Sequence, residues 1–485
     1  MSPSAEGGTD TVGAAGQTWQ ERRREPAAGP RAGGSGADGG GPRVSGLGDW
    51  VAGVRALLSR PLASHYLLLG ITTLLIVLGL IMVLSASSVQ SIAGSGSPYT
   101  LFQRQLLGVA AGLPVMWTAS RMPPRVFRLL AYPLLGAAVL GLIITLIPGV
   151  GQQEFGASRW LNVGPFALQP SEFAKLAFVL WGADLIARKE QFGQLTEWRQ
   201  LLIPLMPGAG LIGVLVMLGN DLGTTFVLLT IFLTLLWVAG TPGRLFILML
   251  IFIGLVVAIL IIVAPYRLER ITSFVNPQAH PNSSGYQELQ GKYALASGGW
   301  FGVGLGESRQ KWGILPDPAS DFIFAILGEE LGLAGTLCVI ALYGGLGYTG
   351  LRIARRIADP FMRMAATAVT AWIVVQALVN IGAVIGLLPV TGVPLPLISD
   401  GVSSLLVTMA ALGMLMSFAR REPGAAEALA ARGPGPARRA LSWLGLAPYS
   451  EAPGKVSIPG RGSARGAERR RGLRDTASRG AARRE

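Results

Sequence analysis

The sequence has very few of the side chains that form disulfides or soft metal sites. Among 485 residues there is one cysteine, Cys338, and there are two histidines, His65 and His280. A single cysteine excludes an intramolecular disulfide and a metal cluster built from cysteine thiolates. Cys338 lies inside an apolar run, so we expect it to be a small residue of the protein core.

Charged residues are also scarce, at 14% of the chain, whereas hydrophobic residues make up 51%. The apolar residues gather in long runs, and a hydrocarbon core about 30 Å thick needs roughly 20 apolar residues per helix. The sequence therefore predicts an all-α polytopic membrane protein with about ten transmembrane helices, at residues 66–88, 105–119, 127–147, 173–187, 201–218, 222–239, 244–263, 322–350, 364–388 and 402–418.

Arginine and lysine are concentrated in every second connection between these runs. Short basic connections face the cytoplasm, so both termini are predicted to be cytoplasmic. The connections 148–172, 264–321 and 389–401 then lie outside, and 264–321, between helices 7 and 8, is too long to be a simple connector. His65 and His280 fall on opposite sides of the membrane, which argues against a metal site made by the two histidines.

The two ends of the chain differ from the apolar centre. Residues 1–60 and 420–485 are rich in glycine, alanine and arginine. The first sixty residues contain no apolar core of the kind found in a signal peptide, so none is predicted. We predict disordered cytoplasmic tails on either side of a membrane domain at 61–419. The basic C-terminal tail is expected to contact anionic lipid or an acidic partner rather than nucleic acid; a solvated tail without a specific function is the alternative.

Two acidic positions lie where apolar runs begin. Glu172 and Lys175 are three residues apart, so on a helix they share a face and can pair. The pair is either structural or part of a cavity wall that contacts substrate, and Ser171 is predicted to cap that helix. Asp221, in LGNDLGTTF, is predicted to cap the following helix, and Gly223 permits a close backbone approach there.

The predicted outer segment 264–321 carries several basic residues, contrary to the usual concentration of basic residues on the cytoplasmic side of a membrane. An anionic headgroup such as a pyrophosphate would account for its basic residues, Arg267, Arg270, Lys292, Arg309 and Lys311. The stretch GGWFGVGLG has glycine spacing like that of a nucleotide-binding loop, but no strand precedes it. A nucleotide site is therefore not predicted.

The stretch PDPASDFIFAILGEELG places carboxylates at the start of an apolar helix. Asp317 and Pro318 are predicted as its N-cap and first residue, which puts Asp321 in the first turn near the outer membrane surface. An ionised carboxylate there can act as a general base; a second capping role is the alternative. Glu329 and Glu330 lie deeper and are expected to pair with polar groups of the bundle.

Several motifs occur in one order along the chain: RWLNVGPFALQPSEFAKLA, NDLGTT, YQELQGKYALASGGWFGVGLGESRQKWGILP, SDFIFAILGEELGLAG and PVTGVPLPLISDGVSSLL. Together they resemble the SEDS family (shape, elongation, division and sporulation), and its division branch, FtsW, most closely. The resemblance spans roughly residues 66–418. SRQKWGILP looks more like the division branch than like the elongation branch, RodA.

The resemblance implies a peptidoglycan glycosyltransferase that polymerises lipid II into β-1,4 glycan strands at the outer face of the bacterial cytoplasmic membrane, at the division septum. The position matching the family's essential carboxylate is Asp321, with the role of general base. A divalent cation, magnesium or manganese, is left open as an aid to the pyrophosphate leaving group. The residues assigned to substrate are Arg159, Glu172, Lys175, Asp221, Arg267, Tyr286, Gln287, Gln290, Lys311, Ser320, Ser399 and Ser403.

The chain departs from the family pattern at several positions. Asn220 stands where the family usually has proline, and Ala319 where it often has histidine. Asp400 and Val402 replace a tyrosine and a glycine of the last motif, which puts the shape of the loop before residue 402 in question. Asp400 could add a carboxylate to the cavity.

The resemblance also implies partners: a class B penicillin-binding protein, which crosslinks the strands, and other divisome proteins. Three alternatives remain open from the sequence. They are a RodA-type elongation polymerase with the same chemistry, a lipid II flippase, and a structural scaffold of the divisome. A flippase should show charged groups across the whole bilayer, and few lie deeper than Glu330.

Overall fold

The computed structural model describes residues 53, 60, 62–154, 157–163, 166–191, 198–263, 265–279 and 284–431. The chain divides into two units, Met1–Val54 and Arg55–Glu485, and every element named below belongs to the second. Nearly all of the tail predicted at 1–60, and residues 432–485, lie outside the described part. The helices are α2 (Ala63–Ser95), α3 (Thr100–Arg121), α4 (Pro124–Thr145), α5 (Pro170–Gln191), α6 (Trp198–Leu218), α7 (Leu222–Val238), α8 (Gly243–Val263), α9 (Pro265–Val275), α10 (Ser284–Ser297), α11 (Ile323–Arg356), α12 (Pro360–Val384), α13 (Val402–Ala419) and α14 (Ala425–Ala431).

Each of the ten predicted apolar runs is helical in the structure, as α2 to α8 and α11 to α13. Within the described ranges, five helices are long and apolar enough to cross a membrane: α2, α4, α11, α12 and α13. Shorter apolar stretches lie in α6, α7 and α8. A helical, multi-pass membrane protein is therefore confirmed, and the count of ten spans stays a prediction.

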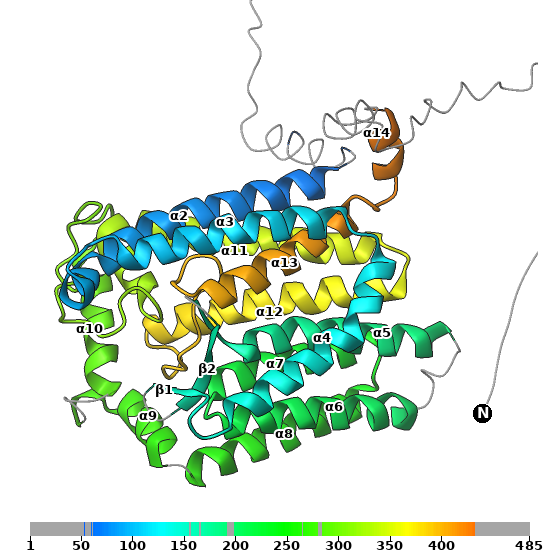
Figure 1. Ribbon diagram of the computed structural model, residues 1–485, viewed down its shortest axis with the longest axis horizontal. Helices are drawn as coiled ribbons and strands as arrows, with labels where there is room; N and C mark the ends of the chain where they lie inside the picture. The colour runs from blue at the N-terminus through cyan, green and yellow to red at the C-terminus, as the bar shows by residue number, and fades with distance from the viewer. Residues whose placement is uncertain are drawn as a thin grey trace, which may run out of the picture. The chain divides into compact units, whose positions relative to one another are not determined.

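Helices α12 and α13 form the centre of the bundle (Figure 1). α12 packs against α5, α7, α11 and α13, and α13 packs against α2, α3 and α5. In their most apolar 18 residues, 72% of α12 and 83% of α13 is buried, against 22% of α4. Apolar side chains of α4, such as Leu129 with 75% of its surface exposed, therefore face outward, as expected of helices in contact with lipid.

Two helix starts show how the sequence sets the helix boundaries. Asp221 is the N-cap of α7, and its carboxylate accepts a hydrogen bond from the Thr224 backbone N–H at 3.0 Å. Asp359 does the same for α12, with Pro360 as the first helical residue. Each carboxylate satisfies a backbone donor that has no partner inside the helix. The predicted cap at Asp221 is confirmed.

The predicted outer connection 148–172 contains a small sheet, so the description all-α needs this correction. Strands β1 (Gln152–Glu154), β2 (Ala157–Val163) and β3 (Phe166–Leu168) pair antiparallel in that order. The register of β2 and β3 sets Leu161 opposite Leu168. Strands this short carry too little alternation for the sequence to indicate them. The sheet places Arg159 on β2 and leads directly into α5.

The segment 264–321 is structured, as its length suggested. It contains α9, the short 3-10 helix η2 (Pro277–Ala279) and α10, followed by turns. α10 packs against α11. The backbone N–H groups of Val303 and Gly304 donate hydrogen bonds to the carbonyls of Glu329 and Glu330, which ties these turns to α11.

The start of α11 differs from the prediction. The helix begins at Ile323, after Phe322, and Asp317 lies in a preceding turn with φ of 48°. Asp317 and Pro318 are therefore not its cap and first residue, and Asp321 precedes the helix instead of lying in its first turn. Ser171, predicted as a cap, lies inside α5, which begins one residue earlier. Contacts with residues distant in sequence, such as Asn380 and Ser399, hold the turn before α11. Capping patterns depend only on neighbouring residues, so they do not predict these contacts.

Two further expectations are wrong. Cys338 is exposed on the surface of α11 and is not a core residue. The C-terminal tail was expected to begin at residue 420, but α14 follows α13 after a short turn. Glu422 is buried there and pairs with Arg356 at 3.1 Å. This contact between residues 66 positions apart extends the ordered part beyond the last apolar run.

Candidate active site

Asp321 lies in a partly buried turn immediately before α11. Asn380 of α12 donates a hydrogen bond to the Asp321 carbonyl at 2.9 Å and another to the Val393 carbonyl at 2.8 Å. Ser399 donates to the Ser320 carbonyl at 2.6 Å and accepts from the Leu395 backbone N–H. The turn of Asp321 and the loop from 393 to 399 are thus fixed to each other and to α12.

The carboxylate of Asp321 has an unusual environment. Burial first and the nearby charge of Asp317 second raise its pKa to about 6, although Arg270, the Ser320 hydroxyl and Arg159 act in the opposite direction. The Ser320 hydroxyl is 3.4 Å from the carboxylate. A carboxyl group that titrates near neutral pH can accept a proton and release it again, as general base catalysis requires.

Two arginines approach this carboxylate from different elements. A methyl group built on Gly392 would lie 3.6 Å from the Asp321 carboxylate and 3.8 Å from the Arg270 guanidinium, so both groups border one small space. Arg270 belongs to α9 and donates to the Val390 carbonyl at 3.1 Å. Arg159 of β2 donates to the Asn220 carbonyl. Both arginines line a cavity of about 200 Å³, and guanidinium groups suit phosphate oxygens.

Asp221 joins the start of α7 to the start of α5. Its carboxylate accepts hydrogen bonds from Gln169 at 3.1 Å and from the Ser171 hydroxyl at 3.3 Å, in addition to those from Thr224. The Ser403 hydroxyl of α13 accepts from the Gln169 backbone N–H and donates to the Ala167 carbonyl. Asp221 and Ser403 therefore fix the chain between β3 and α5.

Glu172 and Lys175 form the predicted ion pair, with 2.7 Å between Nζ and Oε1. Both residues are 1% exposed. Lys175 also donates to the Gln376 side chain at 3.0 Å and lies over the Trp372 ring, 5.1 Å from its centroid. Neither residue lines either of the two cavities described for this chain. Of the two interpretations left open by the sequence, this geometry favours the structural one.

The remaining predicted substrate residues lie on the outer segment. Arg267 is in α9, and its side chain is outside the described part. Tyr286, Gln287 and Gln290 are partly buried on α10. Lys311 is buried beside Glu330, with 3.8 Å between Nζ and Oε1, and donates to the Gly306 carbonyl. Lys311 is thus occupied by an internal pair.

Glu329 and Glu330 have the polar partners expected of buried carboxylates. Glu329 accepts hydrogen bonds from the Ser308 hydroxyl and the Arg309 backbone N–H, and Glu330 accepts one from Ser85. These contacts join α11 to α2 and to the turns after α10. The prediction that both residues pair with polar groups of the bundle is confirmed.

Sequence reasoning missed Arg270 and Asn380, which the structure places beside Asp321, and Gln376, which donates to the Pro394 carbonyl at 2.9 Å. Arg270 was noted as basic, but Arg267 was assigned to substrate, because two arginines three residues apart on one helix cannot be ranked without knowing their neighbours. Asn380 and Gln376 were not chosen. The sequence contained a pattern that could have identified them, because Gln376 and Asn380 are amides four residues apart in an apolar helix. Polar side chains in such a helix usually face the interior of the bundle and have a polar partner there.

The departures from the family pattern have local explanations. Asn220 has φ of 59°, which asparagine tolerates, whereas proline is fixed near −65°. The Asp400 backbone N–H donates to the Ala319 carbonyl at 3.0 Å, and burial raises the pKa of its carboxyl to about 6. Val402 begins α13 and faces Gly108 of α3. Asp400 therefore helps to hold the turn that carries Asp321.

A magnesium or manganese site was left open by the sequence. Among the described residues, no three histidine, cysteine, aspartate or glutamate side chains gather as a metal-ion site. A divalent cation stays a prediction.

The chain resembles known proteins over most of its length. Residues 65–423 match the family model for FtsW, RodA and SpoVE, described as cell cycle protein. A probable peptidoglycan glycosyltransferase FtsW of Mycobacterium tuberculosis is 43% identical over 428 residues, which are 88% of this chain and 79% of that protein. Stage V sporulation protein E of Bacillus subtilis is 38% identical, over 75% of this chain and 99% of that protein.

Solved structures resemble the chain as well. One comes from a peptidoglycan synthase complex that coordinates polymerization and crosslinking; its TM-score is 0.61 at 26% identity, covering 74% of this chain and 98% of that one. Another is the rod shape determining protein RodA of Thermus thermophilus, with a TM-score of 0.55 at 26% identity over 73% of this chain and 96% of that one.

Proposed function

This chain belongs to the FtsW, RodA and SpoVE family, and on that premise we propose that it is a peptidoglycan glycosyltransferase of cell division that polymerises lipid II with Asp321 as general base. The observation that supports the role of Asp321 is its carboxylate, with a pKa raised to about 6, beside Arg270 and near Arg159.

The reaction joins the acceptor sugar hydroxyl to the anomeric carbon of the donor. Asp321 takes the hydroxyl proton as the new carbon–oxygen bond forms, and the bond from that carbon to the diphosphate oxygen breaks with its electron pair on the diphosphate. Arg270 and Arg159 stabilise the negative charge that develops there. The proton on Asp321 then passes to solvent. Attack opposite the leaving group turns an α-linked donor into a β-linked product in one displacement.

We extend the proposal to the assembly in which the chain works. The similar structure from a synthase complex supports a class B penicillin-binding protein as partner, which would crosslink the strands made here. Basic connections between alternate helices support cytoplasmic termini, and the FtsW relatives support action at the septum. Lipid II, other divisome proteins and an anionic lipid or acidic partner for the tail complete the proposal.

The 43% identity with relatives named FtsW favours division over RodA-type elongation. Glu329 and Glu330 accept hydrogen bonds from other groups of the protein. These two carboxylates therefore give no support to a transport path for lipid II, as a flippase would need. The scaffold alternative predicts no polymerase activity.

The test is polymerisation of labelled lipid II by the purified protein with its cognate class B partner in liposomes. Asp321→Asn keeps size and hydrogen bonding but removes the base, and we expect a loss of at least about 100-fold. Asp359→Asn is the matched control, because asparagine also caps helices and Asp359 lies at the start of α12. Full activity of folded Asp321→Asn would overturn the role of Asp321, and no polymer from the wild type would overturn the function.

A further inference from the structure

Three basic side chains gather where α2 begins and where α3 and α13 end. These helices pack against one another, and their shared end lies toward α14 (Figure 1). His65 is in the first turn of α2, Arg121 is the last residue of α3, and Arg420 follows the last residue of α13. The charges of Arg420 and Arg121 both act on the His65 ring, so the three groups are close together. In the predicted orientation this end faces the cytoplasm.

Hydrogen bonds hold two of these groups against neighbouring helices. His65 Nδ1 lies 3.3 Å from the Met416 carbonyl of α13. Arg420 donates from Nη1 to the Ser120 carbonyl of α3 at 3.3 Å. The Nε–H group of Arg420 has no hydrogen-bond partner in the part of the chain that the structure describes. The basic cluster of His65, Arg121 and Arg420 is thus built by three helices, and the Arg420 guanidinium is incompletely paired.

The basic cluster differs from the other arginines at this end of the bundle in lacking a carboxylate partner. Four other arginines form ion pairs at 2.8 to 3.7 Å: Arg128 with Asp184 and Asp359, Arg188 with Asp184, Arg356 with Glu422, and Arg363 with Glu190. Within the described ranges, Arg121 and Arg420 have no such ion pair. Burial first and the charge of Arg121 second lower the pKa of Arg420, so its surroundings disfavour the charged form. A bound anion would offset that penalty.

Exposed apolar surface continues from the basic cluster along α3. The Arg121 guanidinium lies over the Trp117 ring, 4.9 Å from its centroid. Trp117 and Leu113 precede Arg121 by four and eight residues, so the three share one face of α3. Trp117 is 53% exposed and Leu113 is 47% exposed. Tyr66 of α2 is also half-exposed and acts on Arg420. Tryptophan and tyrosine beside basic residues are typical of the boundary between lipid headgroups and hydrocarbon.

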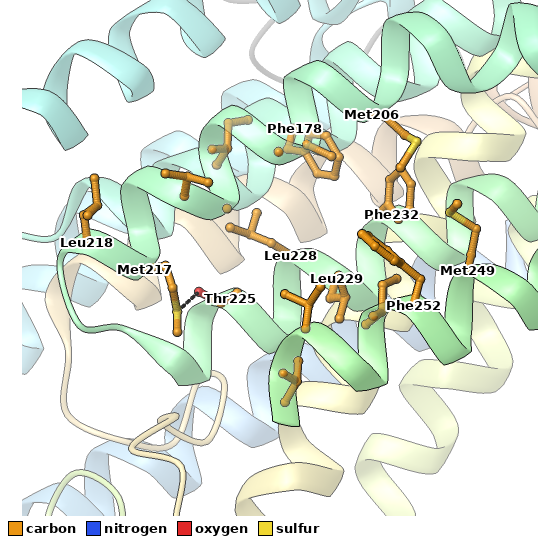
Figure 2. A pocket seen from close by; sticks show the side chains of 18 residues that line it. Phe178, Met206, Met217, Leu218, Thr225, Leu228, Leu229, Phe232, Met249 and Phe252 are labelled. Carbon is orange, nitrogen blue, oxygen red and sulfur yellow. Dashed lines mark hydrogen bonds between the residues drawn. The ribbon is translucent and has the colours of Figure 1, made fainter. Parts of the chain in front are cut away.

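The basic cluster is separate from the cavities described for this chain. The larger cavity, of about 520 Å³, lies between α5, α6, α7 and α8 and is lined mostly by apolar side chains (Figure 2). The smaller one is the arginine-lined cavity near Asp321. None of the three residues of the basic cluster lines either cavity. A ligand of the basic cluster therefore lies outside the candidate active site.

We propose that His65, Arg121 and Arg420 bind the headgroup of an anionic phospholipid of the cytoplasmic leaflet, with its acyl chains along Trp117 and Leu113. Guanidinium groups suit phosphate oxygens. A zwitterionic headgroup carries its own ammonium group, which the two arginines repel, so the site selects net negative charge. The exposed apolar face beside the cluster favours a lipid over a soluble phosphate or an acidic peptide, because neither of these covers it. The inference is independent of the proposed glycosyl transfer.

The first experiment measures lipid binding to the full-length protein in detergent by native mass spectrometry, with phosphatidylglycerol or phosphatidylethanolamine added. We expect the double variant Arg121→Gln, Arg420→Gln to bind its tightest phosphatidylglycerol at least about tenfold more weakly, with phosphatidylethanolamine binding unchanged. The double variant Arg125→Gln, Arg421→Gln is the matched control, because both residues are exposed at the same end and the same charge is removed. Equal weakening by the two double variants would overturn the proposal and indicate attraction to net charge alone.

Competition distinguishes a lipid from other anions. Inorganic phosphate and hexaglutamate are added in large molar excess to the complex of the wild type with phosphatidylglycerol. We expect neither to displace the lipid. Displacement by phosphate would overturn the proposal in favour of a site for soluble phosphates. Displacement by hexaglutamate would overturn it in favour of an acidic protein segment.

A second variant tests the apolar part of the site without a change of charge. We expect Trp117→Ala to weaken phosphatidylglycerol binding by about threefold or more, because the ring supports Arg121 and contacts the acyl chains. Trp237→Ala is the control, since Trp237 is 65% exposed near the end of α7, on the same predicted side of the membrane. Circular dichroism verifies the fold of every variant, and Trp117→Ala decides the question if the arginine variant does not fold. Phosphatidylglycerol binding of folded Trp117→Ala at the wild-type level would refute the site.

Discussion

Asp321 shows how much the protein alters a single side chain. The pKa of its carboxyl is raised to about 6, first by burial and second by the negative charge of Asp317. A base must be ionised to accept a proton, so polymerisation should decline as Asp321 becomes protonated below about pH 6, by about tenfold per pH unit.

Replacing Asp317 tests that assignment. The carboxylate of Asp317 disfavours ionisation of Asp321, so Asp317→Asn lowers the pKa of Asp321 and moves the acid decline of polymerisation to lower pH. The measurement is the rate of lipid II polymerisation between pH 4.5 and 8, with Asp359→Asn as the control that leaves the profile in place. An acid decline that stays where it is, or moves to higher pH, would contradict the proposed base.

Glu172 and Lys175 are the second informative pair of residues. Removing one partner of a buried ion pair leaves the other charge without compensation, which costs about 3–5 kcal/mol. We expect Lys175→Met to lower the free energy of unfolding by about that amount, and the double variant Glu172→Gln, Lys175→Met to recover most of it. Unfolding in detergent followed by circular dichroism measures this.

The double variant also decides what the pair does. If the pair is structural, the double variant polymerises lipid II within a few-fold of the wild-type rate. A stable double variant with a loss of about 100-fold or more would restore the substrate role that the sequence left open.

At the scale of elements, α11 and the turns before it form one unit. Gly332 has φ of 66° and ψ of −164°, a conformation accessible essentially only to glycine, and it interrupts α11. A side-chain carbon there would lie 2.3 Å from the Gly302 nitrogen. The interruption thus lets the turns after α10 pack directly on the helix that follows Asp321.

Gly332→Ala should therefore be destabilising by at least about 1–3 kcal/mol, because it combines backbone strain with a collision. Gly344→Ala is the control in the same helix: it is exposed, and an added carbon meets nothing within 4 Å. Thermal unfolding midpoints of the purified proteins compare the two. Equal midpoints for Gly332→Ala and Gly344→Ala would show that this packing adds little stability.

At the scale of the whole molecule, the orientation in the membrane is the main remaining prediction. The single cysteine makes it directly testable, because Cys338→Ala gives a background without thiols. We expect Gln278→Cys to react with a membrane-impermeant maleimide in spheroplasts, and Arg125→Cys to react only after permeabilisation. Both positions are exposed, one in η2 and one near the start of α4. The opposite labelling pattern would invert the topology.

Comparison of sequence and structure shows which features are local. The ten apolar runs all correspond to helices, and the cap at Asp221 lies where its sequence predicts. These features depend on residues within a few positions of one another, through apolar length and capping hydrogen bonds. The pairing of Glu172 with Lys175 was equally predictable, because i and i+3 share a helix face.

The sequence by itself thus determined a helical membrane protein and its family, and it singled out Asp321 as the candidate base. The tertiary structure decided which groups surround that carboxylate. Three features depend on contacts between segments distant in sequence. They are the place of Arg270 beside Asp321, the bonds of Asn380 to the chain at 321 and 393, and the start of α11 at Ile323. Such contacts follow from how the helices pack, and no local pattern of residues specifies that packing.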